Sequence, residues 1–262
     1  MQQMTFMECV KCAWASAREA VTQMPGLVIG TFLIYAALGW VAMAGRPVPG
    51  DGDDPSSALI LAANIATILN ALVYLWFTLK IYRFVLLGEQ ASPVLPGGAM
   101  PLVRLLGFGV VLVLGGALTM ALFWLVLRPH HTGGILFLSL VVVTLWMCVA
   151  VRLCLLSPAL AMGGRFAFGA AWRDSRGHFW SLAGVSFMAA LPVLLCGLVV
   201  MIGLVFAGIT PESVETPAGL AALALGQSAA NIAFVLVTTT ALAWLHRRYA
   251  KELDPQQSPR NF

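Results

Sequence analysis

The chain has 262 residues, of which 60% are hydrophobic and only 10% are charged. A water-soluble domain carries roughly 25% charged residues, and a chain this apolar would expose aggregation-prone surface in water. The composition therefore excludes an ordinary soluble protein and indicates a membrane protein.

Six apolar runs follow one another along the chain, each about long enough to cross a hydrocarbon core of roughly 30 Å. The strands of an outer-membrane barrel would instead be short segments of alternating polarity. The runs therefore predict an all-α membrane protein with six transmembrane helices. They are Leu27–Ala44, Ala58–Leu79, Leu102–Leu127, Gly134–Val151, Leu182–Ala207 and Gly219–Leu245.

The distribution of Lys and Arg predicts the orientation. If both termini lie in the cytoplasm, all but two of the 15 Lys and Arg residues fall on the inner side, the exceptions being Arg46 and Arg128. This bias follows the positive-inside rule and predicts an N-in/C-in protein of the bacterial cytoplasmic (inner) membrane. The net charge of +4 then reflects topology, and no basic soluble face is left for binding nucleic acid.

The first run has a competing interpretation as a cleaved signal peptide. Ala42-Met43-Ala44 fits the small-x-small rule for a cleavage site. However, about 26 residues precede the run, and they include Glu8 and Glu19. A retained span is the preferred interpretation, and cleavage would leave the later topology unchanged.

Short sequence repeats indicate duplication of a helical unit. The pentapeptide Ala-Ala-Asn-Ile-Ala occurs at Ala62–Ala66 and again at Ala229–Ala233, each time inside an apolar run. The pattern Ala-Trp-x-x-x-Arg precedes the first span at Ala13–Arg18 and the fifth at Ala171–Arg176.

Arg-x-x-Leu-Leu also closes the second span at Arg83 and the fourth at Arg152. These matches predict one six-helix domain, 1–250, made of three consecutive helical hairpins with interfacial lead-in helices on the cytosolic side. The repeat units would be 1–88, 89–160 and 161–250, all in one orientation. Residues 251–262 would form a short polar cytosolic tail.

The segment Gly164–Trp180 interleaves aromatic and basic residues. At about 100° per residue, its rings share one helix face with guanidinium groups beside them. This pattern is typical of a helix lying in the headgroup layer. The simpler interpretation is that the segment only anchors the membrane boundary. The residues predicted to contact lipid headgroups or a partner are Arg165, Trp172, Arg173 and Arg176.

The stretch RLCLLSPALAMGGRFAFGAAWRDSRGHFWSLAGV, from Arg152 on, and YRFVLLGE at Tyr82–Glu89 carry a family resemblance. They resemble patterns in poorly characterised bacterial membrane proteins related to the membrane domain found beside glycerophosphodiester phosphodiesterases. The resemblance implies a polytopic inner-membrane protein. The soluble phosphodiesterase domain that supplies the chemistry in the enzymes of that group has no counterpart here.

Four amide side chains lie within predicted spans. An amide in hydrocarbon is costly unless its donors and acceptor are paired, so these residues should face the bundle interior or a wet cavity. Hydrogen bonds between helices are the simpler interpretation. The alternative is a polar patch that lines a substrate path between the second and sixth spans. The residues are Asn64, Asn70, Gln227 and Asn231.

Motifs for catalysis are not found. The sequence contains no His-Glu-x-x-His, Gly-x-x-x-x-Gly-Lys or Gly-x-Ser-x-Gly, and no carboxylate lies within a span. Cys9-x-x-Cys12 could supply half of a zinc site, but nothing places further ligands beside it. We therefore expect that the chain is not an enzyme and that it has no catalytic residues, metal or cofactor.

Two functions follow from these patterns. The first is a non-enzymatic membrane protein that organises lipid or protein partners at the cytosolic face. Its partners would be membrane lipids, anionic ones included, a membrane protein, or further copies of the same chain. The second is a transporter or lipid-handling protein that uses the polar patch between the second and sixth spans.

Overall fold

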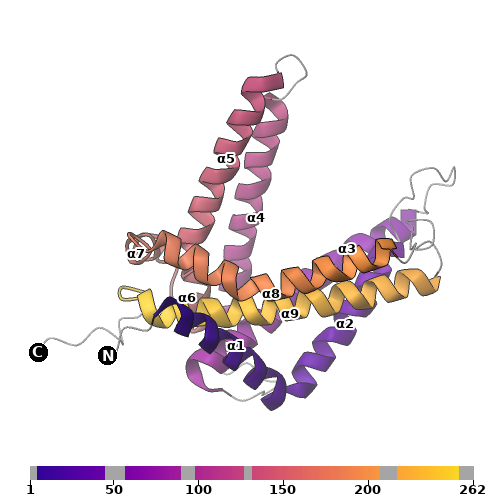
Figure 1. Ribbon diagram of the computed structural model, residues 1–262, viewed down its shortest axis with the longest axis horizontal. Helices are drawn as coiled ribbons and strands as arrows, with labels where there is room; N and C mark the ends of the chain where they lie inside the picture. The colour runs from indigo at the N-terminus through magenta and orange to yellow at the C-terminus, as the bar shows by residue number, and fades with distance from the viewer. Residues whose placement is uncertain (1–4, 45–56, 90–97, 127–131, 207–216, 254–262) are drawn as a thin grey trace, which may run out of the picture.

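The structure, a computed structural model, describes residues 5–44, 57–89, 98–126, 132–206 and 217–253. Every regular element within these ranges is an α-helix (Figure 1), as the apolar runs predicted. The helices are α1 (Phe6–Gln23), α2 (Pro25–Ala44), α3 (Ser57–Leu87), α4 (Met100–Val126), α5 (Thr132–Leu153), α6 (Leu156–Ala161), α7 (Phe168–Asp174), α8 (Phe179–Phe206) and α9 (Pro217–Tyr249).

Five helices, α2, α3, α4, α8 and α9, are long and apolar enough to cross a bilayer. The fourth predicted span, Gly134–Val151, coincides with α5, whose apolar stretch among the described residues, Leu140–Leu153, is shorter. Many apolar side chains of these helices face outward; Leu61 is 61% exposed and Val113 is 70% exposed. Such surface is stable in contact with acyl chains and not with water. The fold is that of a multi-pass membrane protein.

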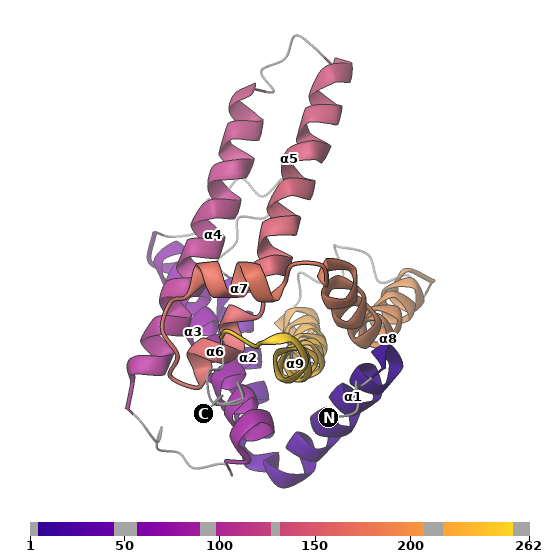
Figure 2. The ribbon, with the colours of Figure 1, turned by 90° about the vertical axis from the view of Figure 1, so that its left-hand side faces the viewer.

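Helix α9 lies at the centre of the molecule. It packs against α1, α2, α3, α6 and α8, and in Figure 2 it is seen end-on with these helices around it. The end of the molecule formed by α1, α6, α7 and the C-terminal turns of α3 and α9 is called the base below. In this part of α9 the side chains of Ala241, Ala243 and Leu245 are fully buried.

Burial along α3 increases toward the base. All nine side chains from Phe77 to Val85 are buried, packed among Met24, Leu105 and Val235 of neighbouring elements. In the half of α3 nearer Ser57, the only buried side chains are those of Ala63 and Ala66. Protein therefore surrounds α3 at the base, whereas its other half is open to the surrounding lipid.

Helix α1 begins with a capping box. The Thr5 backbone N–H donates to Glu8 Oε2 at 2.6 Å and the Glu8 N–H donates to Thr5 Oγ1 at 3.4 Å, which satisfies two donors of the first turn. One face of α1, with Cys9 and Ala13, packs against α8 and α9. The predicted interfacial lead-in at Ala13–Arg18 is thus part of a helix that covers the base.

Helices α4 and α5 pack together and extend away from the other long helices (Figure 1). The Trp146 ring lies against two consecutive glycines of α4. A Cβ atom added at Gly115 would lie 2.1 Å from Trp146 Cη2, and one at Gly116 would lie 3.3 Å from its Nε1. The indole therefore fills space that the missing side chains leave.

Arginines at the base bond to carbonyls at helix ends. Arg104 donates to the carbonyls of Gly163 and Gly164 at 2.6 and 2.9 Å. Arg247 of α9 donates to the Val85 carbonyl in the last turn of α3 at 2.6 Å. The last carbonyls of a helix have no partner within it, so these cations stabilise the loops and fix α9 to α3.

Candidate functional site

The aromatic and basic segment forms a shorter helix than its pattern predicted. Phe168–Asp174 forms α7, Phe179 and Trp180 already belong to α8, and a turn with Gly177 at φ +82° separates the two helices. Gly177 takes this left-handed conformation without the steric penalty that a side chain would bring. The rings expected on one continuous face therefore lie on two helices that are set apart by the turn.

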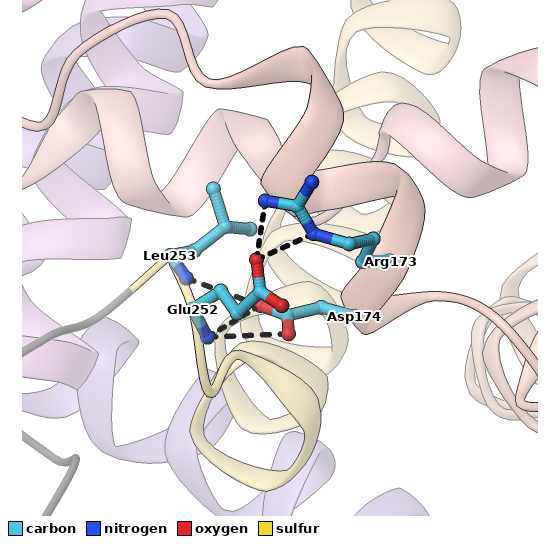
Figure 3. Close-up of polar contacts among 4 residues, drawn as sticks. All are labelled: Arg173, Asp174, Glu252 and Leu253. Atoms are coloured by element: carbon cyan, nitrogen blue, oxygen red, sulfur yellow. Dashed lines mark hydrogen bonds and ion pairs between the residues drawn. The ribbon is translucent and has the colours of Figure 1, made fainter.

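Arg173 is engaged with the chain after α9 (Figure 3). Its Nε and NH2 atoms contact Glu252 Oε2 at 2.7 and 2.6 Å, and this carboxylate holds the pKa of Arg173 above its usual value. The neighbouring Asp174 carboxylate accepts from the backbone N–H groups of Glu252 and Leu253 at 3.0 and 3.1 Å. These contacts bind residues 252 and 253 to α7.

Trp172 is engaged as well. The Arg152 guanidinium at the end of α5 lies 4.3 Å from the centroid of its ring, a favourable cation–π distance. Arg165 and Arg176 are exposed, and neither makes an ion pair with another described residue. Of the four residues predicted to contact headgroups or a partner, Trp172 and Arg173 thus hold the base together, and Arg165 and Arg176 face outward.

The four predicted amides do not hydrogen-bond to one another. Among the described residues, Asn64, Asn70, Gln227 and Asn231 form no hydrogen bond between helices. Asn70, Gln227 and Asn231 instead line one cavity of about 350 Å³ between α2, α3 and α9. Asn64 is exposed on α3, as Gln227 and Asn231 are on α9, but it does not line this cavity.

The cavity takes one face from each of three helices. On α3 and α9 the lining residues recur at i, i+3, i+4 and i+7, and on α2 at i, i+4, i+7 and i+8, which are spacings of a single helix face. On α3 the lining residues lie near the middle of the helix, whereas on α2 they extend into its last turn. The lining residues are Tyr35, Gly39, Ala42 and Met43 from α2; Thr67, Asn70, Ala71 and Tyr74 from α3; and Ala224, Gln227, Ser228 and Asn231 from α9.

Part of the polar lining is already paired and part is not. Thr67 donates to the Ala63 carbonyl at 2.8 Å and Ser228 donates to the Ala224 carbonyl at 2.6 Å. In contrast, Asn70 Oδ1 is buried and has no hydrogen-bond partner. Buried polar atoms without a partner are rare in folded proteins. Asn70 thus presents an acceptor that a bound molecule could use.

Sequence reasoning missed the contribution of α2. Tyr35 is 7% exposed and lines the cavity together with Gly39, where a Cβ atom would lie 3.9 Å from Ser228 Oγ. One signal in the sequence could have indicated a lining face on α2. Tyr35 and Gly39 are four residues apart, as Asn70 and Tyr74 are on α3, and residues at this spacing share a helix face. A tyrosine in an apolar run is common in membrane helices, so this signal has little force until the helices are seen together.

The Cys-x-x-Cys pair lies on α1, in the base. Cys9 is fully buried, and Arg248 donates to its Sγ at 3.5 Å. Burial raises the pKa of the Cys12 thiol, which disfavours the thiolate that binds metals. Within the described residues, no group of three His, Cys, Asp or Glu side chains could hold a metal ion.

The helices and the cavity define a helical multi-pass membrane protein with a polar site among three of its long helices. No family model matches the chain, and neither a curated protein nor a solved structure is similar to it. The function must therefore be inferred from the chemistry of the cavity and of the base.

Proposed function

We propose that the chain is a non-enzymatic membrane protein that binds a small molecule or a lipid headgroup in the cavity between α2, α3 and α9, as part of transport or lipid handling. One observation carries this proposal. Three amides from two helices converge on the cavity without bonding to each other, and Asn70 Oδ1 is left without a partner.

Energetics favour binding over a purely structural role. Leaving a buried polar group unpaired costs about 1–3 kcal/mol, and a membrane interior offers no bulk water to reduce that cost. If the amides served only to join helices, they would be expected to bond across the interface. A bound molecule that donates to Asn70 and bonds to Gln227 and Asn231 would satisfy these groups.

The proposal includes a topology. Six spans in three hairpins, with both ends inside, would place the base in the cytosol of a bacterium and the protein in its inner membrane. The arginines gathered at the base support this orientation. Along α2 the cavity extends from Tyr35 to Met43, away from the base, so the site would lie in the middle and outer half of the bilayer.

The test compares two asparagines that line the cavity, Asn70 and Asn231, with Asn64. Asn64 occupies the same place as Asn231 in the repeated pentapeptide. Asn231→Leu and Asn70→Leu should each strongly reduce the amount of small molecule or lipid that copurifies in mild detergent, measured by mass spectrometry. Asn64→Leu is the matched control, since Asn64 lies outside the cavity, and it should leave that amount unchanged. Equal retention in all three variants would rule out the cavity as the binding site.

A second function is supported by the open part of the base. Arg165 and Arg176 are exposed, and so are Phe166, Phe168 and Trp180 of the same stretch, of which Trp180 is 82% exposed. Cations next to exposed rings suit anionic headgroups or a membrane-protein partner. The double variant Arg165→Ala/Arg176→Ala should then lose copurifying anionic lipid or partner, whereas Arg173→Ala, which removes an arginine engaged with Glu252, should retain it.

A further inference from the structure

Two buried hydroxyl groups next to the cavity lack partners. Thr31 is 1% exposed and Thr78 is 6% exposed, and the Oγ1 atom of each has no hydrogen-bond partner. The Tyr74 hydroxyl, one turn earlier on α3, interacts with Thr78 without completing a hydrogen bond of good geometry. Thr31 therefore retains its full capacity to donate and accept, and Thr78 retains the part that its weak interaction with Tyr74 does not use.

Other threonines of the same protein behave differently. Thr67, Thr144 and Thr240 each donate to the carbonyl four residues earlier, at 2.8, 2.6 and 2.9 Å. This is the usual way in which a threonine in a membrane helix satisfies its hydroxyl. Since Thr31 and Thr78 do not use it, their hydroxyls remain available to a partner from outside their own helix.

Each of the two threonines lies one helical turn nearer the base than a tyrosine that lines the cavity. Helices α2 and α3 pack side by side in opposite directions (Figure 1), and Tyr35 and Tyr74 both line the cavity. Thr31 precedes Tyr35 by four residues and Thr78 follows Tyr74 by four. Each threonine thus shares a helix face with a cavity-lining tyrosine, one turn nearer the base.

The lining of the cavity carries no formal charge. Among its described lining residues there is no Lys, Arg, Asp, Glu or His. The cation on α3 nearest in sequence to Asn70 is Lys80, ten residues on, or about 15 Å along the helix. An ion held in such surroundings would lose its hydration without gaining a countercharge. An uncharged group with hydroxyls or amides would instead match the donors and acceptors present.

We propose that the cavity takes an uncharged, hydroxyl-rich molecule or lipid headgroup, and that Thr31 and Thr78 form the floor of its site. Neither threonine lines the cavity itself, so the deepest hydroxyl of the bound group must enter one helical turn further toward the base to reach them. This inference rests on the proposed function and adds to it the class of substrate and two further binding residues.

The experiment measures binding to the full chain in lipid nanodiscs. Two neutral probes separate the sources of the group: monoglucosyl diacylglycerol within the bilayer and methyl glucoside in solution. Their charged counterparts are phosphatidylglycerol and glucose 6-phosphate. At least one neutral probe should bind more tightly than its charged counterpart, and whichever binds identifies the source. Binding of neither neutral probe, or tighter binding of a charged one, would overturn the proposal.

The floor of the site is tested by removing one hydroxyl at a time. Thr31→Val and Thr78→Val should each weaken binding of the neutral probe about fivefold, the effect of one hydrogen bond. Thr240→Val is the control, because Thr240 is equally buried but its hydroxyl is already bonded. The Thr240→Val variant should bind the neutral probe with the affinity of the wild type. Without probe, Thr31→Val and Thr78→Val should unfold at the same or a higher temperature than the wild type, because each removes an unpaired buried hydroxyl.

If both threonine variants bound the neutral probe with wild-type affinity, Thr31 and Thr78 would not form the floor of the site. If Asn231→Leu still abolished binding in that case, the cavity would stand and only this inference would fail. If Asn231→Leu also bound the probe normally, the proposed function itself would fail.

Discussion

Gly115 provides a sharp test of how α4 and α5 pack. Gly115→Ala places a methyl group 2.1 Å from Trp146 Cη2, whereas carbon atoms are in favourable contact at about 3.5–4.0 Å. The indole must therefore move by more than about 1 Å, and overpacking of this kind costs about 1–3 kcal/mol. Gly116→Ala is the control, since its Cβ atom would lie 3.3 Å from the same ring.

Both variants gain the same helix propensity, about 1 kcal/mol, so this gain cancels when they are compared. Gly115→Ala should be less stable than Gly116→Ala by about 1–3 kcal/mol, measured by unfolding in detergent micelles with increasing dodecyl sulfate. In a Trp146→Ala background the difference should vanish, because the ring is gone. Equal stability of the two alanine variants with Trp146 present would refute the described packing.

Two further predictions concern the base. Asp174→Asn should release the chain after α9 more than Arg173→Ala does, because Asp174 accepts two backbone N–H groups while the Arg173–Glu252 pair is largely exposed. The rate of proteolysis at residues 252 and 253 measures this release. Greater release by Arg173→Ala would contradict the reasoning. Hydrogen bonds from Arg83 lower the pKa of Glu89 from its ordinary 4.5, so the ion pair stabilises the fold above that pH and its contribution is lost as the pH falls from about 4.5 through the lowered pKa. The unfolding temperature of Glu89→Gln should accordingly fall less with acidification than that of the wild type, and parallel curves would exclude this role.

The sequence predicted the helices better than it predicted their contacts. Each of the six apolar runs coincides with a long helix, because the length and composition needed to satisfy the backbone in lipid are local properties. The end of α7 depends on the turn at Gly177 before α8. A glycine after basic residues is a common signal for a helix end, and the spacing of the aromatic residues alone does not take it into account.

The repeated pentapeptide shows why the site was harder to predict. Ala63 and Ala66 turn one face of α3 inward, whereas at the equivalent place on α9 the buried residue is Ile232. Asn64 and Asn231 are both exposed, but only Asn231 lines the cavity, although their neighbours in sequence are identical. The rotation of a helix about its axis is set by the helices around it, which the sequence of one segment does not contain.

The central position of α9 has a consequence for biosynthesis. Helix α9 contacts α1, α2, α3, α6 and α8, yet the ribosome makes it after all of them. Until α9 enters the bilayer, the faces of α1 and α8 that it covers have no protein partner, and the cavity lacks the wall formed by Gln227 and Asn231. Assembly must therefore wait for the last described helix, and a chain stopped before residue 217 would enter the membrane without closing its core or its site.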